Sequence, residues 1–164
     1  MPQWEKSIAG ERIHPSILEA PVEQRAPART SCRACPGHGH APGWRGRCTA
    51  SYCIEARHGL LLHWWAPSSF LTAPTILSSL EAYRALSDGY ALPVVIHLQE
   101  PRGISPAGRA AMLEATQNSR VALVGNGPVD RVLTAFSEGG LSDTRYFESV
   151  VHAELWARGA GVLS

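Results

Sequence analysis

The 164-residue sequence has little of several features that mark common protein classes. Its 15 basic and 14 acidic side chains nearly cancel, so the excess positive charge that binds a phosphate backbone is lacking, and nucleic acid is not an expected partner. Its longest apolar stretch, near GLLLHWWAP, is far shorter than the roughly 20 residues that cross a bilayer. The start, MPQWEKSIA, contains no apolar leader segment. We therefore expect a soluble, cytoplasmic protein without membrane insertion.

Aliphatic side chains are scarce in residues 1–50, where Pro, Gly, Arg, Cys and His dominate stretches such as APARTSCRACPGHGHAPGWRGRC. A segment of this composition buries too little apolar surface to offset the entropy that it loses on ordering. We predict that residues 1–50 form a mostly disordered tail. Residues 51–164 are long enough for one domain with its own core.

From about Tyr52 onward, short apolar runs alternate with helical periodicity, as they do in α/β domains. YCIEAR and LLLHWWA, joined by His58-Gly59, predict a β-hairpin. LPVVIHLQ and RVALVGNG are apolar on both faces, which predicts central buried strands. TRYFES is the last expected strand.

Helical segments separate these strands, and they begin near Pro74, Pro106, Pro128 and Ser149. In the third helix one apolar stripe is expected to face the core, and it consists of Val129, Val132, Leu133 and Phe136. The predicted order is β-β-α-β-α-β-α-β-α. This is an α/β fold with a mixed sheet of four to five strands and three to four helices.

Three stretches carry a family resemblance: LPVVIHLQEPRGISPAGRAAML, RVALVGNGPVDRVLTAF and TRYFESVVHAELWARG. Following a hairpin, they resemble the STAS (sulfate transporter and anti-sigma factor antagonist) domains of small bacterial proteins over residues 52–159. The resemblance implies a SpoIIAA-like fold and a non-enzymatic protein-interaction domain in regulation, with a kinase or an anti-sigma factor as its partner. The alternative is a module of the same fold that binds a small ligand, a nucleotide or a lipid.

The loop after the central strand is the candidate switch. In phosphorylation-switched STAS proteins it carries Asp-Ser-Ser/Thr-Gly, whose first serine is phosphorylated by a partner kinase. The resemblance places the glycine at Gly108 and the serine at Pro106, which has no hydroxyl, so Ser105 is the remaining candidate. Ser105 is interpreted as a helix cap, as a phosphoacceptor flanked by Arg102 and Arg109, or as a catalytic serine without an accompanying His-Asp arrangement.

The sequence VGNGP, residues 124–128, precedes the third helix and makes Asn126 and Gly127 candidate ligand-loop residues. It lacks the third glycine and the Lys-Ser/Thr pair of nucleotide-binding loops. A tight strand-to-helix turn is therefore the competing interpretation.

The cysteines Cys32, Cys35, Cys48 and Cys53 follow the spacing C-x2-C-x12-C-x4-C, with His38 and His40 between them. These groups can supply the ligands of a tetrahedral zinc site. Incidental thiols in a disordered segment, or a redox pair formed by Cys32 and Cys35, are the other interpretations. No cofactor besides zinc is indicated.

Little in the sequence argues for catalysis, because no acid/base pair or metal triad stands out. His63 and His97 lie on apolar strands and are expected to be core or edge histidines. We predict that the chain is not an enzyme.

Overall fold

The structure is a computed structural model, and it describes residues 34, 40 and 42–159. Its strands are β1 (Gly46–Cys48), β2 (Tyr52–Arg57), β3 (Leu60–Trp65), β4 (Phe70–Leu71), β5 (Val94–His97), β6 (Gly103–Ile104), β7 (Arg120–Val124) and β8 (Asp143–Phe147). Its α-helices are α1 (Ala73–Leu86), α2 (Pro106–Leu113), α3 (Pro128–Thr134) and α4 (Val150–Ala157), and a 3-10 helix, η1 (Ala135–Gly139), follows α3.

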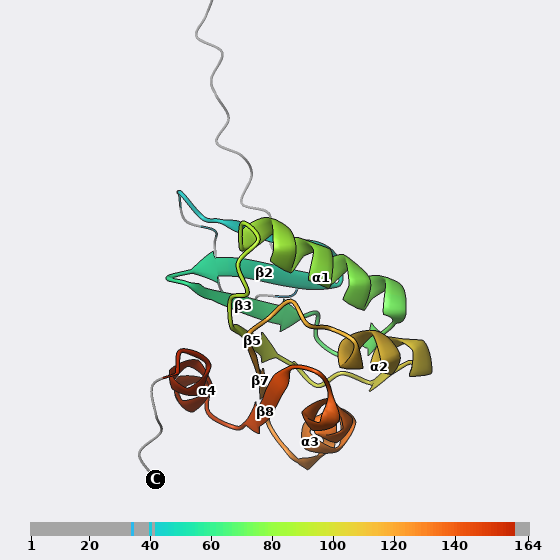
Figure 1. Cartoon of the computed structure of the whole chain (residues 1–164). Helices are drawn as coiled ribbons and strands as arrows, with labels where there is room; N and C mark the ends of the chain where they lie inside the picture. Colours follow the sequence, from blue (N-terminus) through green and yellow to red (C-terminus); the bar gives the residue numbers. More distant parts are fainter. Residues whose placement is uncertain (1–33, 35–39, 41, 160–164) are drawn as a thin grey trace, which may run out of the picture.

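The main sheet has six strands in the order β1-β2-β3-β5-β7-β8. Its first three strands are antiparallel to one another, and β3, β5, β7 and β8 run parallel. Figure 1 shows α1 and α2 on one side of this sheet and α4 on the other. The predicted α/β class, the mixed sheet and the four helices are confirmed.

The predicted number of strands, four to five, is wrong for the main sheet. The additional strand is β1, which pairs antiparallel with β2 and places Cys48 opposite Cys53. Its sequence, GRC, is too short to show the alternation of apolar and polar residues by which strands are predicted. The sheet therefore reaches into the residues whose composition predicts a tail.

The turns form where the sequence places residues that tolerate a positive φ. His58 and Gly59, with φ of 49° and 75°, join β2 to β3. Helix α1 stops before Asp88 and Gly89, whose φ values are 52° and 83°. The predicted hairpin is thus confirmed.

Two cores form because the central strands are covered on both faces. On one face, Leu61 and Trp65 of β3 pack with residues of α1 such as Ile76. On the other face, Leu60 and Leu62 of β3 pack against α4. Alternate residues of β3 enter opposite cores, which explains why the whole strand is apolar.

Helix α3 is rotated relative to the sequence prediction. Val129 and Val132, expected in the core, are 68% and 74% exposed, whereas Asp130 and Thr134 are buried. Asp130 faces inward because its carboxylate accepts the backbone N–H of Asn126 at 2.9 Å. The predicted apolar stripe is therefore wrong at both valines.

None of the helices in residues 42–159 is both long and apolar enough to span a bilayer.

Candidate functional site

Two loops at the carboxyl ends of β5 and β7 lie side by side, as expected for neighbouring parallel strands. Between them is a shallow surface groove, which we name the loop groove. Its lining residues are Glu100, Pro101, Arg102, Asn126, Gly127, Pro128, Val129 and Asp130. The loop groove thus brings together Arg102, Asn126 and Gly127 among the residues singled out from the sequence.

The loop after β5 is held in an unusual backbone conformation by tertiary hydrogen bonds. Gln99 and Glu100 are consecutive non-glycine residues with φ of 54° and 55°. The side-chain amide of Gln99 donates to the carbonyl of Trp65 at 2.7 Å and also to that of Ala34. The backbone N–H of Arg102 donates to the Ser69 carbonyl at 2.8 Å. These bonds fix the loop and leave the Arg102 side chain exposed.

The loop after β7 is built around a close approach at Gly125. A Cβ at this position would lie 2.6 Å from the Cβ of Asp130 and 2.8 Å from the phenol oxygen of Tyr146. The Tyr146 hydroxyl donates to the Gly127 carbonyl at 3.1 Å, and burial raises the pKa of this phenol. The backbone N–H of Asn126 already donates to the Asp130 carboxylate, so this N–H is not available to bind a phosphate. This arrangement favours the turn interpretation over a phosphate-binding loop.

Ser105 is the N-cap of α2, and the capping interpretation is confirmed. Its hydroxyl oxygen accepts the Gly108 N–H at 3.0 Å, and Pro106 follows at the first helical position. Gly108 is packed tightly, because a Cβ there would lie 2.9 Å from the carbonyl oxygen of Leu71. Neither Ser105 nor Gly108 lines the loop groove. Phosphorylation of Ser105 stays a prediction.

The two arginines that flank Ser105 in sequence have different surroundings. The guanidinium of Arg109 lies 5.2 Å from the ring centroid of Phe136, in cation–π geometry between α2 and η1. Arg102 instead forms part of the wall of the loop groove. Both arginines were chosen because they are close to Ser105 in sequence, and that criterion cannot show which of them lies at the groove.

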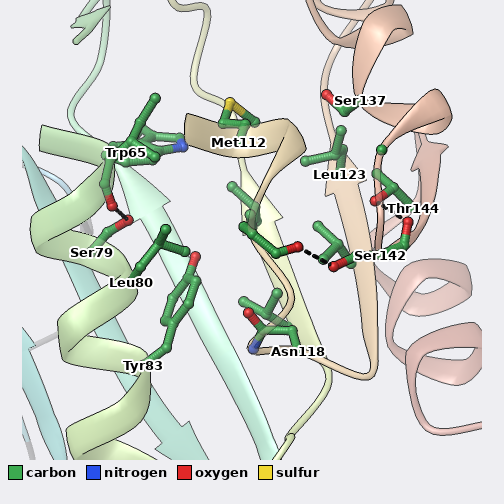
Figure 2. Close-up of a pocket in the computed structure, with 16 residues that line it drawn as sticks. Trp65, Ser79, Leu80, Tyr83, Met112, Asn118, Leu123, Ser137, Ser142 and Thr144 are labelled. Atoms are coloured by element: carbon green, nitrogen blue, oxygen red, sulfur yellow. Dashed lines mark hydrogen bonds between the residues drawn. The ribbon is translucent and has the colours of Figure 1, made fainter. Parts of the chain in front are cut away.

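A small apolar cavity lies between the sheet, α1 and α2 (Figure 2). The space open to the centre of a water molecule is about 50 Å³. That is far below the roughly 300 Å³ or more of a typical ligand pocket. Trp65 Nε1 and Ser137 Oγ line it, and both are buried without a hydrogen-bond partner among the described residues.

A buried His63–Tyr83 pair was only partly foreseen from the sequence. His63 is a core histidine, as predicted, and its Nδ1 shares a hydrogen bond with the Tyr83 hydroxyl. Burial, with a smaller contribution from the charge of His97, lowers the pKa of His63 to about 3. Burial also raises the pKa of Tyr83. Both groups are therefore neutral over the physiological range.

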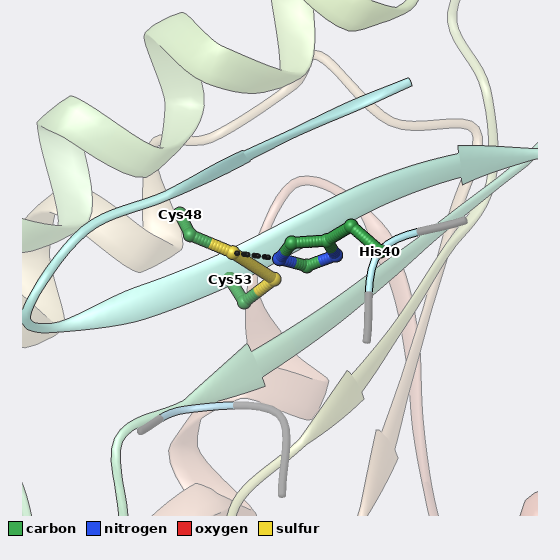
Figure 3. A group of neighbouring side chains, drawn as sticks. All are labelled: His40, Cys48 and Cys53. Carbon is green, nitrogen blue, oxygen red and sulfur yellow. Dashed lines mark hydrogen bonds between the residues drawn. A yellow bond between two sulfur atoms is a disulfide. The ribbon is translucent and has the colours of Figure 1, made fainter. Parts of the chain in front are cut away.

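Cys48, Cys53 and His40 meet on one face of the β1–β2 hairpin (Figure 3). The two cysteines are joined as a disulfide, and His40 Nε2 lies 3.3 Å from Cys48 Sγ. Cys32 and Cys35, the other proposed zinc ligands, lie outside the described residues. Of the candidate zinc ligands, the structure thus brings together His40, Cys48 and Cys53 within the described residues.

No protein-family model matches the chain, and no curated protein matches it. Among solved structures, the chain is similar to a crystal structure of an uncharacterized protein from the DUF3478 family with a SpoIIAA-like fold, from Shewanella loihica PV-4. The two share 17% sequence identity with a TM-score of 0.48, over 65% of this chain and 93% of the other.

Proposed function

We propose that this domain acts by binding a protein partner rather than by catalysis. The contact surface is the α3 face, which we define as the loop groove together with Val129 and Val132 of α3. The observation that carries this proposal is the exposure of those two valines, 68% and 74%: Val129 lines the groove, and Val132 follows it on α3. The sequence resemblance to STAS domains makes a regulatory kinase or an anti-sigma factor the first partner class to test.

The energetics favour a partner at this position. Val129 and Val132 are one helical turn apart, so they form a contiguous patch rather than scattered apolar residues. Burying a fully exposed valine is worth roughly 1.5–3 kcal/mol. Covering both valines would therefore contribute enough to change an affinity by more than tenfold.

Charged groups at the rim of the α3 face add orientation more than affinity. Arg102 is exposed at the groove, so a carboxylate of the partner could pair with it there. Arg131 and Glu148, 3.7 Å apart, are both well exposed. Such a surface pair contributes little to stability, so its loss on partner binding would cost little; the guanidinium of Arg131 also lies 5.1 Å from the ring centroid of Tyr146.

The test compares the valines of α3 with a matched valine elsewhere. Val151 is 66% exposed on α4, on the other side of the sheet (Figure 1). Partners are captured from the native host with the wild type, a V129D/V132D double variant and V151D, and the recovered protein is then purified for affinity measurements. We expect at least a tenfold loss of affinity for the double variant and none for V151D. Equal affinities for all three proteins would refute the proposal.

The switch hypothesis is tested on the same purified partner. A phosphate on Ser105 would lie at the N-terminus of α2, where the helix dipole favours a dianion. Its mass is expected on protein isolated from the host, and Ser105→Glu is expected to change the affinity for the partner. Ser105→Ala is expected to leave that affinity unchanged. Identical affinities for Ser105→Glu and wild type, without a phosphate mass, would leave Ser105 as a cap only.

A second candidate function, the binding of a small ligand such as a nucleotide or a lipid, is favoured by one observation. The cavity beneath α1 and α2 is apolar and yet presents two unpartnered polar groups, Trp65 Nε1 and Ser137 Oγ, among the described residues. Its volume of about 50 Å³ requires α1 and α2 to separate before such a ligand enters. A thermal shift with nucleotides or fatty acids, abolished by Ala115→Leu at the cavity wall, would support this function. No shift with either class would exclude it.

A further inference from the structure

The backbone of the β1–β2 hairpin holds the sulfur atoms of Cys48 and Cys53 close together, whether or not the disulfide bond joins them. Cys48 and Cys53 are directly opposite in the antiparallel ladder, so their side chains leave the same face of the sheet. The turn between them is closed by the Thr49 N–H, which donates to the Tyr52 carbonyl at 2.8 Å. The Thr49 hydroxyl oxygen accepts the N–H groups of Ser51 and Tyr52, each at 3.1 Å. The sulfurs therefore stay adjacent when the disulfide is reduced.

His40 brings a nitrogen ligand to the same point. Its Nε2 lies 3.3 Å from Cys48 Sγ, and its ring stacks on Trp44 with the ring centroids 3.7 Å apart. The ligand atoms of His40, Cys48 and Cys53 all lie within 4.8 Å of one another. Zn–S and Zn–N bonds of about 2.3 and 2.0 Å at tetrahedral angles separate ligand atoms by roughly 3.5–4 Å. Small side-chain rotations would bring the three groups to that geometry.

The surroundings of the cluster suit a metal that is held but accessible. Cys53 is buried and packs against Ala34 and Trp64. Cys48 and His40 are only half-buried, so a cation can reach the sulfurs from one side. An apolar floor with a partly open side is the environment in which a neutral histidine and two thiolates bind a borderline-soft cation strongly.

We propose that His40, Cys48 and Cys53 form a zinc-binding site whenever the Cys48–Cys53 disulfide is reduced. An external dithiol supplies the two electrons: the disulfide becomes two thiols, and the dithiol becomes a disulfide. Zinc then displaces the two thiol protons and is bound by two sulfurs and His40 Nε2, with water at the fourth position. In the reverse exchange the external disulfide takes back the two electrons and becomes the dithiol, Cys48 and Cys53 form their disulfide again, and the metal is released.

This inference is independent of the proposed partner surface. The cluster lies on β1, β2 and residue 40, whereas the α3 face consists of α3 and the loops after β5 and β7. The experiment on zinc binding and the experiment on partner binding can therefore give independent results.

The test measures zinc directly on the full chain. The protein is reduced with a phosphine, desalted under nitrogen and titrated with zinc against a chromophoric chelator, and cobalt is used to detect thiolate-to-metal charge transfer. Reduced wild type is expected to bind one zinc per chain, and the oxidised wild type none at this site. Cys48→Ser and Cys53→Ser should each weaken binding at least tenfold and lower the charge-transfer intensity. His40→Ala should weaken binding while the charge-transfer band of both thiolates remains.

A Cys32→Ser/Cys35→Ser double variant is the control for the other cysteines. It is expected to keep the zinc stoichiometry of the wild type. Far-UV circular dichroism shows that each variant is folded, which the backbone bonds of the hairpin should ensure. The proposal is overturned if reduced wild type binds no zinc. It is equally overturned if the double variant loses all zinc while Cys48→Ser keeps it.

Discussion

Protonation of His63 should control the acid stability of this domain. The side chain is fully buried, with Nδ1 against the Tyr83 hydroxyl, and Nε2 is buried with no hydrogen-bond partner among the described residues. A charged imidazolium in this position would be cut off from solvent by burial, and no carboxylate of the described residues forms an ion pair with it. The folded state therefore excludes the proton that the unfolded state binds.

The magnitude follows from the two pKa values. The pKa of His63 is about 3 in the folded state and 6.5 in the unfolded chain, mainly because burial disfavours the charged form. The unfolded state thus binds more protons between these values, so the free energy of unfolding falls as the pH falls below 6.5. Between pH 7 and pH 4 this single group should remove about 3 kcal/mol. Well above pH 6.5, where neither state binds this proton, it contributes no pH dependence.

Urea denaturation at pH 7 and at pH 4 measures this effect in wild type, His63→Gln and a control, His152→Gln. Glutamine can still accept a hydrogen bond from Tyr83 but does not titrate. The loss of stability at low pH should be about 3 kcal/mol smaller in His63→Gln than in wild type. The control, an exposed histidine on α4, should keep the full loss. If wild type and His63→Gln lose the same amount, the reasoning about this histidine is refuted.

The remaining predictions concern the loops that form the candidate site, and urea denaturation at pH 7 measures each of them. Ser105→Ala removes the cap of α2 and should lower the free energy of unfolding by about 1 kcal/mol; an unchanged value would contradict the capping role. Gly108→Ala places a Cβ 2.9 Å from the Leu71 carbonyl and should cost roughly 1–3 kcal/mol, whereas a gain in stability would show that this contact can relax. Asp130→Ala leaves the Asn126 N–H without its acceptor and should cost roughly 1–3 kcal/mol, so a neutral effect would argue against the inward role of this carboxylate.

The central elements could be predicted from the sequence because their signals are local. Strand β3 is apolar throughout since both of its faces are covered, and LPVVIHLQ is apolar for the same reason. Ser105-Pro106 indicates a helix start that the structure reproduces. His58-Gly59 similarly indicates the hairpin turn.

The errors arose where a tertiary contact overrides the local pattern. In α3 the periodicity favours buried valines, but the bond between Asp130 and the loop after β7 turns the helix so that Val129 and Val132 face solvent. In β1, three residues give no periodic signal, and only pairing with β2 makes them a strand. The candidate contact surface therefore depends on the exposure of Val129 and Val132, which the sequence pattern did not predict.

The cluster of His40, Cys48 and Cys53 likewise could be predicted only in part from the sequence. Spacing alone indicated that Cys48 and Cys53 could bind the same metal ion, but it could not show whether His38 or His40 lies beside them. The position of His40 follows from its stacking on Trp44, a contact between side chains that composition does not encode. The loop groove is similar, because it joins Arg102 to Asn126 across two strands that are distant in sequence.

The most direct test of the partner-binding account is a photocrosslinking measurement in the native host. A photoreactive amino acid replaces Val132 in one version of the protein and Val151 in another, since both valines are well exposed and lie on different helices. The account predicts a discrete crosslinked protein from position 132 and none from position 151. Crosslinks of equal yield from both positions, or from position 151 alone, would contradict the claim that the α3 face binds a partner.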